Sequence, residues 1–294
     1  MNVGEKIRSL RQAKLMTQSE LAGTKITRNM LSCIENGRAQ PSIQTIVYLA
    51  ERLGVSVGFL LAEARDELLY RKMNSFENIK KAFCEKNWES CRSLCRSVSN
   101  EPDDELCMIL AQSDVGIAED TFWKGKLREA CRYFDEALDY AGKTVYPQPQ
   151  IKAVTALYFR LMLRISPTLF LENFDEQKSM DFVLQTPFAR YLDALEAIDE
   201  GDLSRAERFL KEHRKSTFFA THLRVKCHLA RREYQEAKAL LEQLLNASEP
   251  LLNEVELYLV LSDLETVCRE TEDYKGAYRY ANERIELHEQ LLKE

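Results

Sequence analysis

Long hydrophobic runs, glycine and proline are all scarce in this sequence of 294 residues. No stretch approaches the roughly 18 consecutive apolar residues of a membrane helix. Residues 1–11 form a charged amphipathic run without the apolar block of a signal peptide. These absences argue against membrane insertion and predict a cytoplasmic protein. With only 10 glycines and 7 prolines, the chain has few residues that punctuate strands and turns, and we expect an all-α fold.

Motifs for metal binding and catalysis are also missing. The eight cysteines form no C-x-x-C pair, and the closest two, Cys91 and Cys95, have no histidine nearby. We expect reduced thiols packed in or near the core. The four histidines, at 213, 222, 228 and 288, lie outside any nucleophile, phosphate-loop or metal motif, which favours surface or partly buried structural roles. The sequence therefore predicts no enzyme, no catalytic residue, no cofactor and no metal.

Charge is distributed unevenly along the chain. Residues 1–64 contain 8 Lys and Arg against 5 Asp and Glu, whereas residues 65–294 contain 33 against 42. A phosphate backbone would attract the first part and repel the second. Together with the change of helical pattern near residue 73, this asymmetry predicts an N-terminal domain at 1–64, a linker at 65–72 and a helical-repeat domain at 73–294.

The N-terminal segment begins with two predicted helices. Val3, Ile7 and Leu10 recur at intervals of three and four residues, which is typical of an amphipathic helix. Thr17 and Glu20 have the spacing of a capping box, in which each side chain bonds the backbone amide of the other. This pair predicts a short second helix at residues 18–22.

Three further helices follow a break at residues 23–26. Thr27 is a favourable N-cap for a third helix from residue 28 to about 36, which Gly37 would end in a left-handed conformation. Ser42 would cap a fourth helix at residues 43–53, ended by Gly54, and residues 55–61 would form a short fifth helix. Five helices in about 60 residues predict a compact bundle in which two short helices are joined by a tight turn.

These residues resemble the Xre/Cro-type helix-turn-helix repressors. The segments that carry the resemblance are 17–22 (TQSELA), 26–32 (ITRNMLS), 34–38 (IENGR) and Pro41-Ser42, continued by Leu49-Ala50, Leu53-Gly54-Val55 and Leu60-Leu61. The resemblance covers the first fifth of the chain. It implies a five-helix, lambda-repressor-like domain that binds double-stranded operator DNA and regulates transcription.

The helix-turn-helix departs from the common form of that family in one respect. Gln18 and Thr27 lie nine positions apart, one fewer than is usual. A turn shortened by one residue is typical of the peptide-pheromone-sensing regulators known as the RRNPP family, which also carry tetratricopeptide repeats. The resemblance implies quorum sensing through a short signalling peptide.

The third helix is the expected recognition helix. Leu31 and Ile34 lie three positions apart and should face the core, which turns the opposite face toward the major groove. Arg28 can donate two hydrogen bonds to guanine O6 and N7, and Asn29 can pair in the same way with adenine N6 and N7. The side chains expected to face the groove are those of Arg28, Asn29, Ser32 and Cys33. Cys33 either contacts a thymine methyl group or is a partly buried small side chain.

Other residues are expected to hold the phosphate backbone or the domain itself. The resemblance implies that Gln18 binds a phosphate. Further candidates for phosphate contact are Thr27, the amides around Asn36 and Gly37, and Arg38. Arg11 and Glu35 correspond to residues that form an internal salt bridge in related domains, which implies a structural role for both.

A five-residue pattern recurs in the C-terminal part of the sequence. It consists of a polar turn, a large apolar residue, two mostly polar residues and a small one. The large residues stand at positions 88, 127, 203, 234 and 274, with spacings of 39, 76, 31 and 40. Because 76 is twice 38, we expect a degenerate repeat between 151 and 180. The pattern resembles divergent tetratricopeptide repeats and predicts an α-solenoid, with an irregular helical bundle as the alternative.

Two hypotheses follow for the function of the whole chain. In the first, the protein is a sequence-specific transcription regulator whose repeats sense a short peptide or a partner protein. A homodimer would then match a palindromic operator with half-sites about 34 Å apart. In the second, it is a protein-interaction adaptor or a ligand-independent repressor with an accessory DNA-binding head. Residues 252–292 would either cap the repeats or form the dimer interface.

Overall fold

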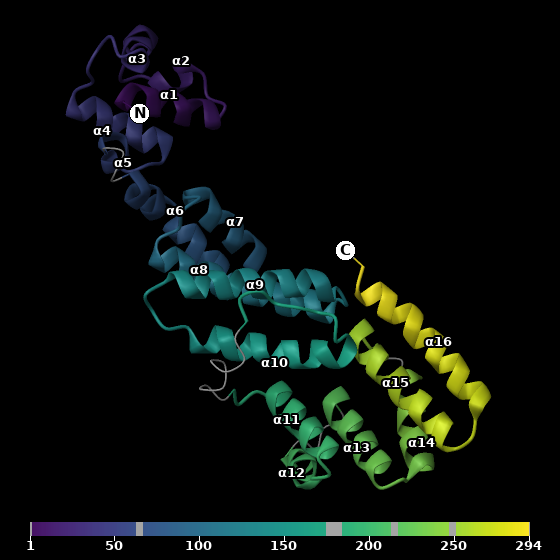
Figure 1. The fold of residues 1–294 in the computed structure, drawn as a ribbon. Helices are drawn as coiled ribbons and strands as arrows, with labels where there is room; N and C mark the ends of the chain where they lie inside the picture. The colour runs from purple at the N-terminus through teal and green to yellow at the C-terminus, as the bar shows by residue number, and fades with distance from the viewer. Residues whose placement is uncertain (1, 63–66, 175–183, 213–216, 247–250, 294) are drawn as a thin grey trace. The chain divides into compact units, whose positions relative to one another are not determined.

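The computed structural model describes residues 2–62, 67–174, 184–212, 217–246 and 251–293. Within these ranges all regular secondary structure is helical, which confirms the all-α prediction. No helix among them is long and apolar enough to cross a membrane. The chain divides into two compact units, Met1–Pro102 and Asp103–Glu294, whose helices are labelled in Figure 1.

The first unit begins with the five helices expected from the sequence. They are α1 (Val3–Ala13), α2 (Gln18–Ala22), α3 (Arg28–Glu35), α4 (Ile43–Leu53) and α5 (Val57–Leu61). The bounds of α2 and α4 agree with the prediction, α3 ends one residue early, and α5 begins two residues late. The five-helix architecture is confirmed.

Local hydrogen bonds explain why these boundaries could be predicted. The hydroxyls of Thr17, Thr27 and Ser42 each accept a hydrogen bond from the amide three residues further on. At Thr17 the reciprocal bond of the capping box is also present. Gly37 and Gly54 adopt φ angles of +70° and +63°, a conformation that glycine reaches without steric cost. Each helix end is therefore set by residues within a few positions of it.

The five helices enclose one small apolar core. Its fully buried members include Ile7, Leu21, Leu31, Ile34, Leu49, Leu53 and Leu60. At one point two helices meet too closely for a side chain: a methyl group at Gly4 of α1 would lie 2.0 Å from the carbonyl oxygen of Ile34 in α3. This close approach ties the recognition helix to α1.

Two further helices, α6 (Glu67–Cys84) and α7 (Trp88–Val98), belong to the first unit. The Tyr70 ring covers Gly58, where a methyl group would lie 2.2 Å from the ring. Asn74 accepts a hydrogen bond from the amide of Ser56 at 3.2 Å. Of the expected linker at 65–72, residues 65 and 66 lie outside the described residues and the rest form the first turns of α6. The domain boundary at 64 stays a prediction.

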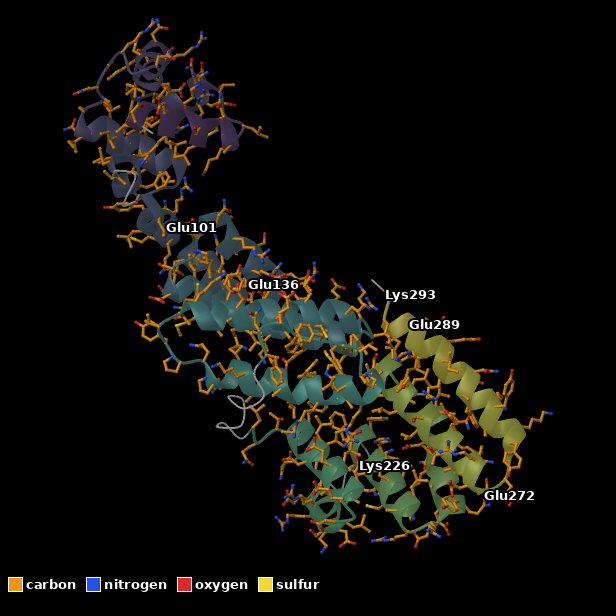
Figure 2. All side chains as sticks on the ribbon, in the orientation of Figure 1. Glu101, Glu136, Lys226, Glu272, Glu289 and Lys293 are labelled. Carbon is orange, nitrogen blue, oxygen red and sulfur yellow. The ribbon has the colours of Figure 1, made fainter. Side chains whose placement is uncertain are left out.

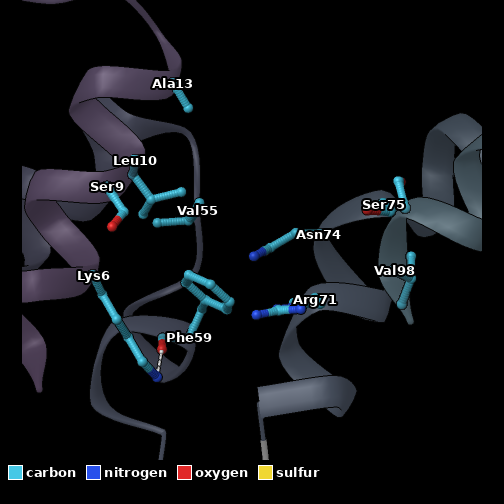
Figure 3. A pocket seen from close by; sticks show the side chains of 11 residues that line it. Lys6, Ser9, Leu10, Ala13, Val55, Phe59, Arg71, Asn74, Ser75 and Val98 are labelled. Carbon is cyan, nitrogen blue, oxygen red and sulfur yellow. Dashed lines mark hydrogen bonds between the residues drawn. The ribbon is translucent and has the colours of Figure 1, made fainter. Parts of the chain in front are cut away.

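A cavity of about 370 Å³ lies within the first unit. Figure 3 shows the side chains of α1 and of the segment around α5 facing those of α6 and α7 across it. Its lining consists of Lys6, Ser9, Leu10, Ala13, Val55, Phe59, Arg71, Asn74, Ser75, Ser97 and Val98. Lys6 is a buried cation that donates hydrogen bonds to the carbonyl oxygens of Phe59 and Ala62, at 3.1 and 2.9 Å. No local pattern around Lys6 predicts its burial.

The second unit contains nine of the helices that the structure describes. They are α8 (Asp104–Trp123), α9 (Leu127–Lys143), α10 (Pro149–Ile165), α11 (Pro187–Asp199), α12 (Ser204–Glu212), α13 (Phe218–Ala230), α14 (Tyr234–Leu245), α15 (Glu254–Glu270) and α16 (Tyr274–Leu291). Consecutive helices pack as pairs, of which α8 with α9, α13 with α14 and α15 with α16 are clear examples (Figure 1).

The recurring sequence pattern marks the start of the second helix of each pair. Its large residue is the first residue of α7, α9, α14 and α16, and it directly precedes α12. The small residues Cys91, Ala130, Ala206 and Ala237 are all fully buried, because the two helices of a pair approach each other there. Two positions before each large residue the backbone has a positive φ, at Lys86, Gly125, Gly201, Arg232 and Glu272. A repeated left-handed turn therefore underlies the repeat.

The degenerate repeat expected between 151 and 180 is only partly within the described chain. The long helix α10 fills its first half, and residues 166–174 contain no helix. Residues 175–183 lie outside the described ranges, so this expectation stays a prediction.

The core of the second unit is rich in aromatic and, at one place, polar side chains. Tyr158 and Tyr191 are buried. The hydroxyl of Tyr191 lies 2.8 Å from Nδ1 of His222, whose Nε2 lies 3.0 Å from Asp263. Lys226, labelled on α13 in Figure 2, completes the cluster by an ion pair with Asp263. The expectation of a surface or partly buried histidine is wrong for His222, because α11, α13 and α15 enclose it completely.

Candidate nucleic-acid interface

The turn between α2 and α3 depends on a glycine. Gly23 has a φ of +55°, and a methyl group there would lie 2.3 Å from the hydroxyl oxygen of Tyr48. That hydroxyl donates a hydrogen bond to the carbonyl oxygen of Ala22 at 3.0 Å, and Arg52 donates one to the carbonyl oxygen of Glu20. Two side chains of α4 thus hold the end of α2, and only glycine fits beside them.

A buried ion pair joins the first three helices. Arg11 of α1 donates two hydrogen bonds to Glu35 of α3, from Nε at 2.7 Å and from Nη2 at 3.0 Å. Gln18 of α2 donates a third to the same carboxylate at 2.9 Å. Burial alone would raise the pKa of Glu35, but the hydrogen bonds from Arg11 and Gln18 hold it below its ordinary value. The salt bridge that the resemblance implied is confirmed. It fixes the orientation of α3 relative to α1 and α2.

The expected base-reading side chains share one face of α3. Arg28 and Asn29 are exposed at its N-terminal end, whereas Leu31 on the opposite face is fully buried. Ser32 is half-buried on the same exposed side. Cys33 is exposed. The alternative interpretation, a partly buried side chain, is therefore wrong. The face therefore offers one guanidinium, one amide and two small side chains to a groove.

The expected phosphate contacts differ in how available they are. The Thr27 hydroxyl accepts a hydrogen bond from Met30 N at 3.1 Å and keeps its own hydrogen for a phosphate. Gln18 uses one of its two amide hydrogens on Glu35, which leaves one. Arg38 is exposed.

The backbone amides at the end of α3 are not available, contrary to expectation. The amides of Asn36, Gly37 and Arg38 donate to the carbonyl oxygens of Ser32, Ile34 and Cys33, respectively, at 2.8 to 3.1 Å. The side-chain amide of Asn36 also donates to the Ser32 carbonyl, at 2.8 Å. These bonds close the C-terminal turn of the helix, because its last carbonyls have no partners further along the helix. A phosphate at this end would have to be met by side chains.

A hollow at the turn supplies a feature that sequence reasoning missed. It encloses about 480 Å³ and is lined by Ser19, Ala22, Gly23, Thr24, Lys25, Ile26, Thr27 and Arg28. The lining has three hydroxyls and two cations but no carboxylate, which suits an anion such as a phosphate. Lys25 lies over the Tyr48 ring, 5.1 Å from its centre. Only the fold shows that Lys25 shares a concave wall with Arg28.

Comparison with known proteins matches these features to an established motif. A family model described as helix-turn-helix matches residues 7–60. No curated protein matches the chain.

Several solved structures are similar over nearly the whole chain, at low identity. ComR from S. thermophilus, in complex with DNA and its signalling peptide ComS, is 17% identical with a TM-score of 0.23, covering 97% of this chain and 99% of that one. Bacillus thuringiensis PlcR, in complex with the peptide PapR7 and DNA, is 14% identical with a TM-score of 0.22, covering 100% and 99%. The SHP pheromone receptor Rgg2 of Streptococcus dysgalactiae is 15% identical with a TM-score of 0.20, covering 97% and 99%.

The matched residues 7–60 run from α1 to α5 and include the glycine turn, the Arg11–Glu35 pair and the exposed face of α3. Residues 7–60 of this chain are therefore similar to the helix-turn-helix family.

Proposed function

We propose that this protein is a sequence-specific, DNA-binding regulator of transcription. The observation that carries the proposal is the exposed face of α3, which presents Arg28 and Asn29 while the Arg11–Glu35 pair holds the helix in place. A short helix with its N-terminal side chains exposed fits the major groove. The protein would act in the cytoplasm and without catalysis.

We assign a role to each side chain of the interface. Arg28 reads a guanine and Asn29 an adenine, each by two hydrogen bonds. Ser32 and Cys33 contact neighbouring base edges. The residues that hold phosphates are Gln18, Thr27, Arg38 and, through the remaining hydrogen of its side-chain amide, Asn36, to which the hollow at the turn adds Lys25. Base contacts specify the sequence, whereas phosphate contacts set the position on the duplex.

We further propose a homodimer that responds to a short peptide bound by the second unit. A twofold dimer places two recognition helices in successive major grooves, with half-sites about 34 Å apart. The peptide is proposed from the sequence, because the shortened turn and the recurring helix-pair pattern together resemble the peptide-pheromone receptors. ComR and PlcR were both solved with a peptide and DNA.

Fluorescence anisotropy with DNA from immediately upstream of the gene tests the proposal. The full chain is titrated at two salt concentrations, beside Arg28→Ala and a control, Arg128→Ala, which removes an exposed arginine of α9. We expect saturable binding that weakens steeply with salt, that Arg28→Ala loses and that Arg128→Ala retains. Absence of binding at low salt would favour a protein-interaction adaptor.

A further inference from the structure

One face of helix α1 lines the cavity of the first unit. Lys6, Ser9, Leu10 and Ala13 recur at intervals of three, one and three residues, which places them on one side of the helix, and all belong to the lining. Seven residues of helix rise by about 10 Å, so this wall extends over about that length. Lys6 is 3% exposed, whereas Ser9 and Ala13 are exposed. The wall is therefore buried at Lys6 and reaches solvent toward Ala13.

Apolar side chains line much of the cavity. Leu10 and Ala13 are joined by Val55, by Phe59 of α5 and by Val98 of α7, and we name these five residues the apolar wall. A well-packed protein interior leaves few voids larger than a water molecule. This cavity encloses about 370 Å³, which lies within the range of about 300 to 1,000 Å³ of small-molecule sites. A hydrocarbon body placed against the apolar wall would remove apolar surface of both partners from water.

The polar part of the lining contains positive charges and no carboxylate. Its members are Lys6, Ser9, Arg71, Asn74, Ser75 and Ser97. Figure 3 shows the nitrogen ends of Arg71 and Asn74 pointing from α6 toward Phe59. The carbonyl oxygen of Asn74 accepts a hydrogen bond from the Ser56 amide, so its NH₂ group is the part that it offers to the cavity. This lining suits an anion rather than a cation.

Lys6 has a donor and a charge that its partners within the chain do not match. Its Nζ donates to the carbonyl oxygens of Phe59 and Ala62, where α5 ends. An ammonium group has three hydrogens, and among the described residues no third acceptor and no carboxylate bonds it. The Phe59 ring, 5.2 Å from Nζ, offers its π face but no negative charge. Neutral partners leave the charge uncompensated, and a buried charge is costly without a counter-ion.

We propose that this cavity binds a small amphipathic carboxylate, a medium-chain fatty acid, whose carboxylate bonds Lys6 and whose hydrocarbon chain lies along the apolar wall. The carboxylate would supply both the missing acceptor and the missing counter-charge. The ligand would contact α1 and α5 of the helix-turn-helix bundle and α6 and α7 at the same time.

The dimensions of the cavity favour an unbranched chain of limited length. With the carboxylate at Lys6, the chain runs past Leu10 and reaches Ala13 after about 10 Å, which is about the length of extended octanoate. Because the wall reaches solvent at Ala13, carbons beyond that point would bury little further surface. Affinity should therefore rise with chain length up to octanoate and then level off.

Isothermal titration calorimetry of the full chain with straight-chain carboxylates tests the site. We expect octanoate to bind saturably, one molecule per chain, with a dissociation constant below about 1 mM. Each methylene added from butanoate to octanoate should tighten binding by up to about fourfold, with little further gain in decanoate. Octanol, which has the same chain but no charge, should bind at least about tenfold more weakly. Absence of saturable octanoate binding, or equal affinity for octanol, would overturn the proposal.

Substitutions on α1 locate the site. Lys6→Gln keeps an amide donor near the end of α5 but removes the charge, so it should lose the preference for octanoate over octanol. Ala13→Trp fills the exposed end of the cavity and should weaken octanoate binding at least about tenfold. The matched control is Gln12→Trp, at the neighbouring exposed position outside the lining, which should bind octanoate like the wild type.

The two tryptophan variants decide the assignment even if Lys6→Gln fails to fold, which circular dichroism would show. Octanoate that binds Ala13→Trp as tightly as the wild type occupies another site, and the proposal is then wrong.

Hydrogen exchange of the full chain with and without octanoate gives a second readout. A bound ligand stabilises the elements that it contacts, so protection should rise in peptides from α1 and α6 and stay unchanged in α8–α16. A rise confined to the second unit would place octanoate there and refute the site. Neither experiment contains DNA or a signalling peptide, so the result is independent of whether the proposed function holds.

Discussion

Replacing Glu35 by alanine should destabilise the N-terminal domain more than any substitution on its DNA-binding face. The carboxylate is 3% exposed and accepts three hydrogen bonds, two from Arg11 and one from Gln18. Its loss leaves the largely buried Arg11 guanidinium without this counter-charge; among the described residues, the acceptor that remains is the Met16 carbonyl oxygen. Breaking such a buried pair from one side costs about 3 to 5 kcal/mol. A small domain has a total stability of about 5 to 15 kcal/mol, so much of it would be lost.

Hydrogen exchange of the full chain, followed by mass spectrometry, measures this loss where it occurs. Peptides from α1 to α5 report the opening free energy of the N-terminal domain, and peptides from the second unit serve as an internal control. We expect α1–α5 to lose protection by about 3 kcal/mol or more and α8–α16 to be unchanged. A double variant, Arg11→Met with Glu35→Leu, should be more stable than Glu35→Ala, because it buries no unpaired charge. A loss below about 1 kcal/mol, the size of an exposed salt bridge, would refute the reasoning.

Three more predictions follow from other contacts. Because the folded-state pKa of Glu35 is lowered, the stability that its carboxylate contributes should be complete above the ordinary pKa of glutamate and should be lost as the pH falls through the lowered pKa. Hydrogen-exchange protection measured during an acid titration should show this loss in the wild type and not in Glu35→Gln. Gly4→Ala should lower the melting temperature and the DNA affinity together, because the added methyl group would lie 2.0 Å from the Ile34 carbonyl oxygen and overpacking costs about 1 to 3 kcal/mol. An unchanged melting temperature would contradict this contact. Asp263→Ala should destabilise the second unit by about 3 kcal/mol or more, since it leaves Lys226 without its ion pair with Asp263. Urea unfolding followed by circular dichroism measures this loss of stability, and a change below about 1 kcal/mol would contradict a buried pair.

Features that depend on near neighbours in the chain could be predicted from the sequence. The N-caps at Thr17, Thr27 and Ser42 involve bonds to residues three positions away, so the helix boundaries follow from local chemistry. The recurring pattern that ends in Ala130 and Ala237 likewise marked the start of a second helix, because a small residue is needed where two adjacent helices meet. The positions of Arg28 and Asn29 on the exposed face followed from the 3.6-residue period alone.

Features that depend on residues far apart in the chain were decided by the tertiary structure. The sequence does not show that Gly4 meets Ile34. His222 is buried because helices α11, α13 and α15 close around it, and no local pattern indicates this. The amides after α3 are a local exception: they were expected to bind phosphate, but they bond carbonyl oxygens three to five residues earlier in the chain. Likewise, the period of α6 indicates a helix, but only its packing shows which apolar residues remain exposed. Local propensities define the elements, whereas burial and partners are set by contacts that form only when distant elements come together.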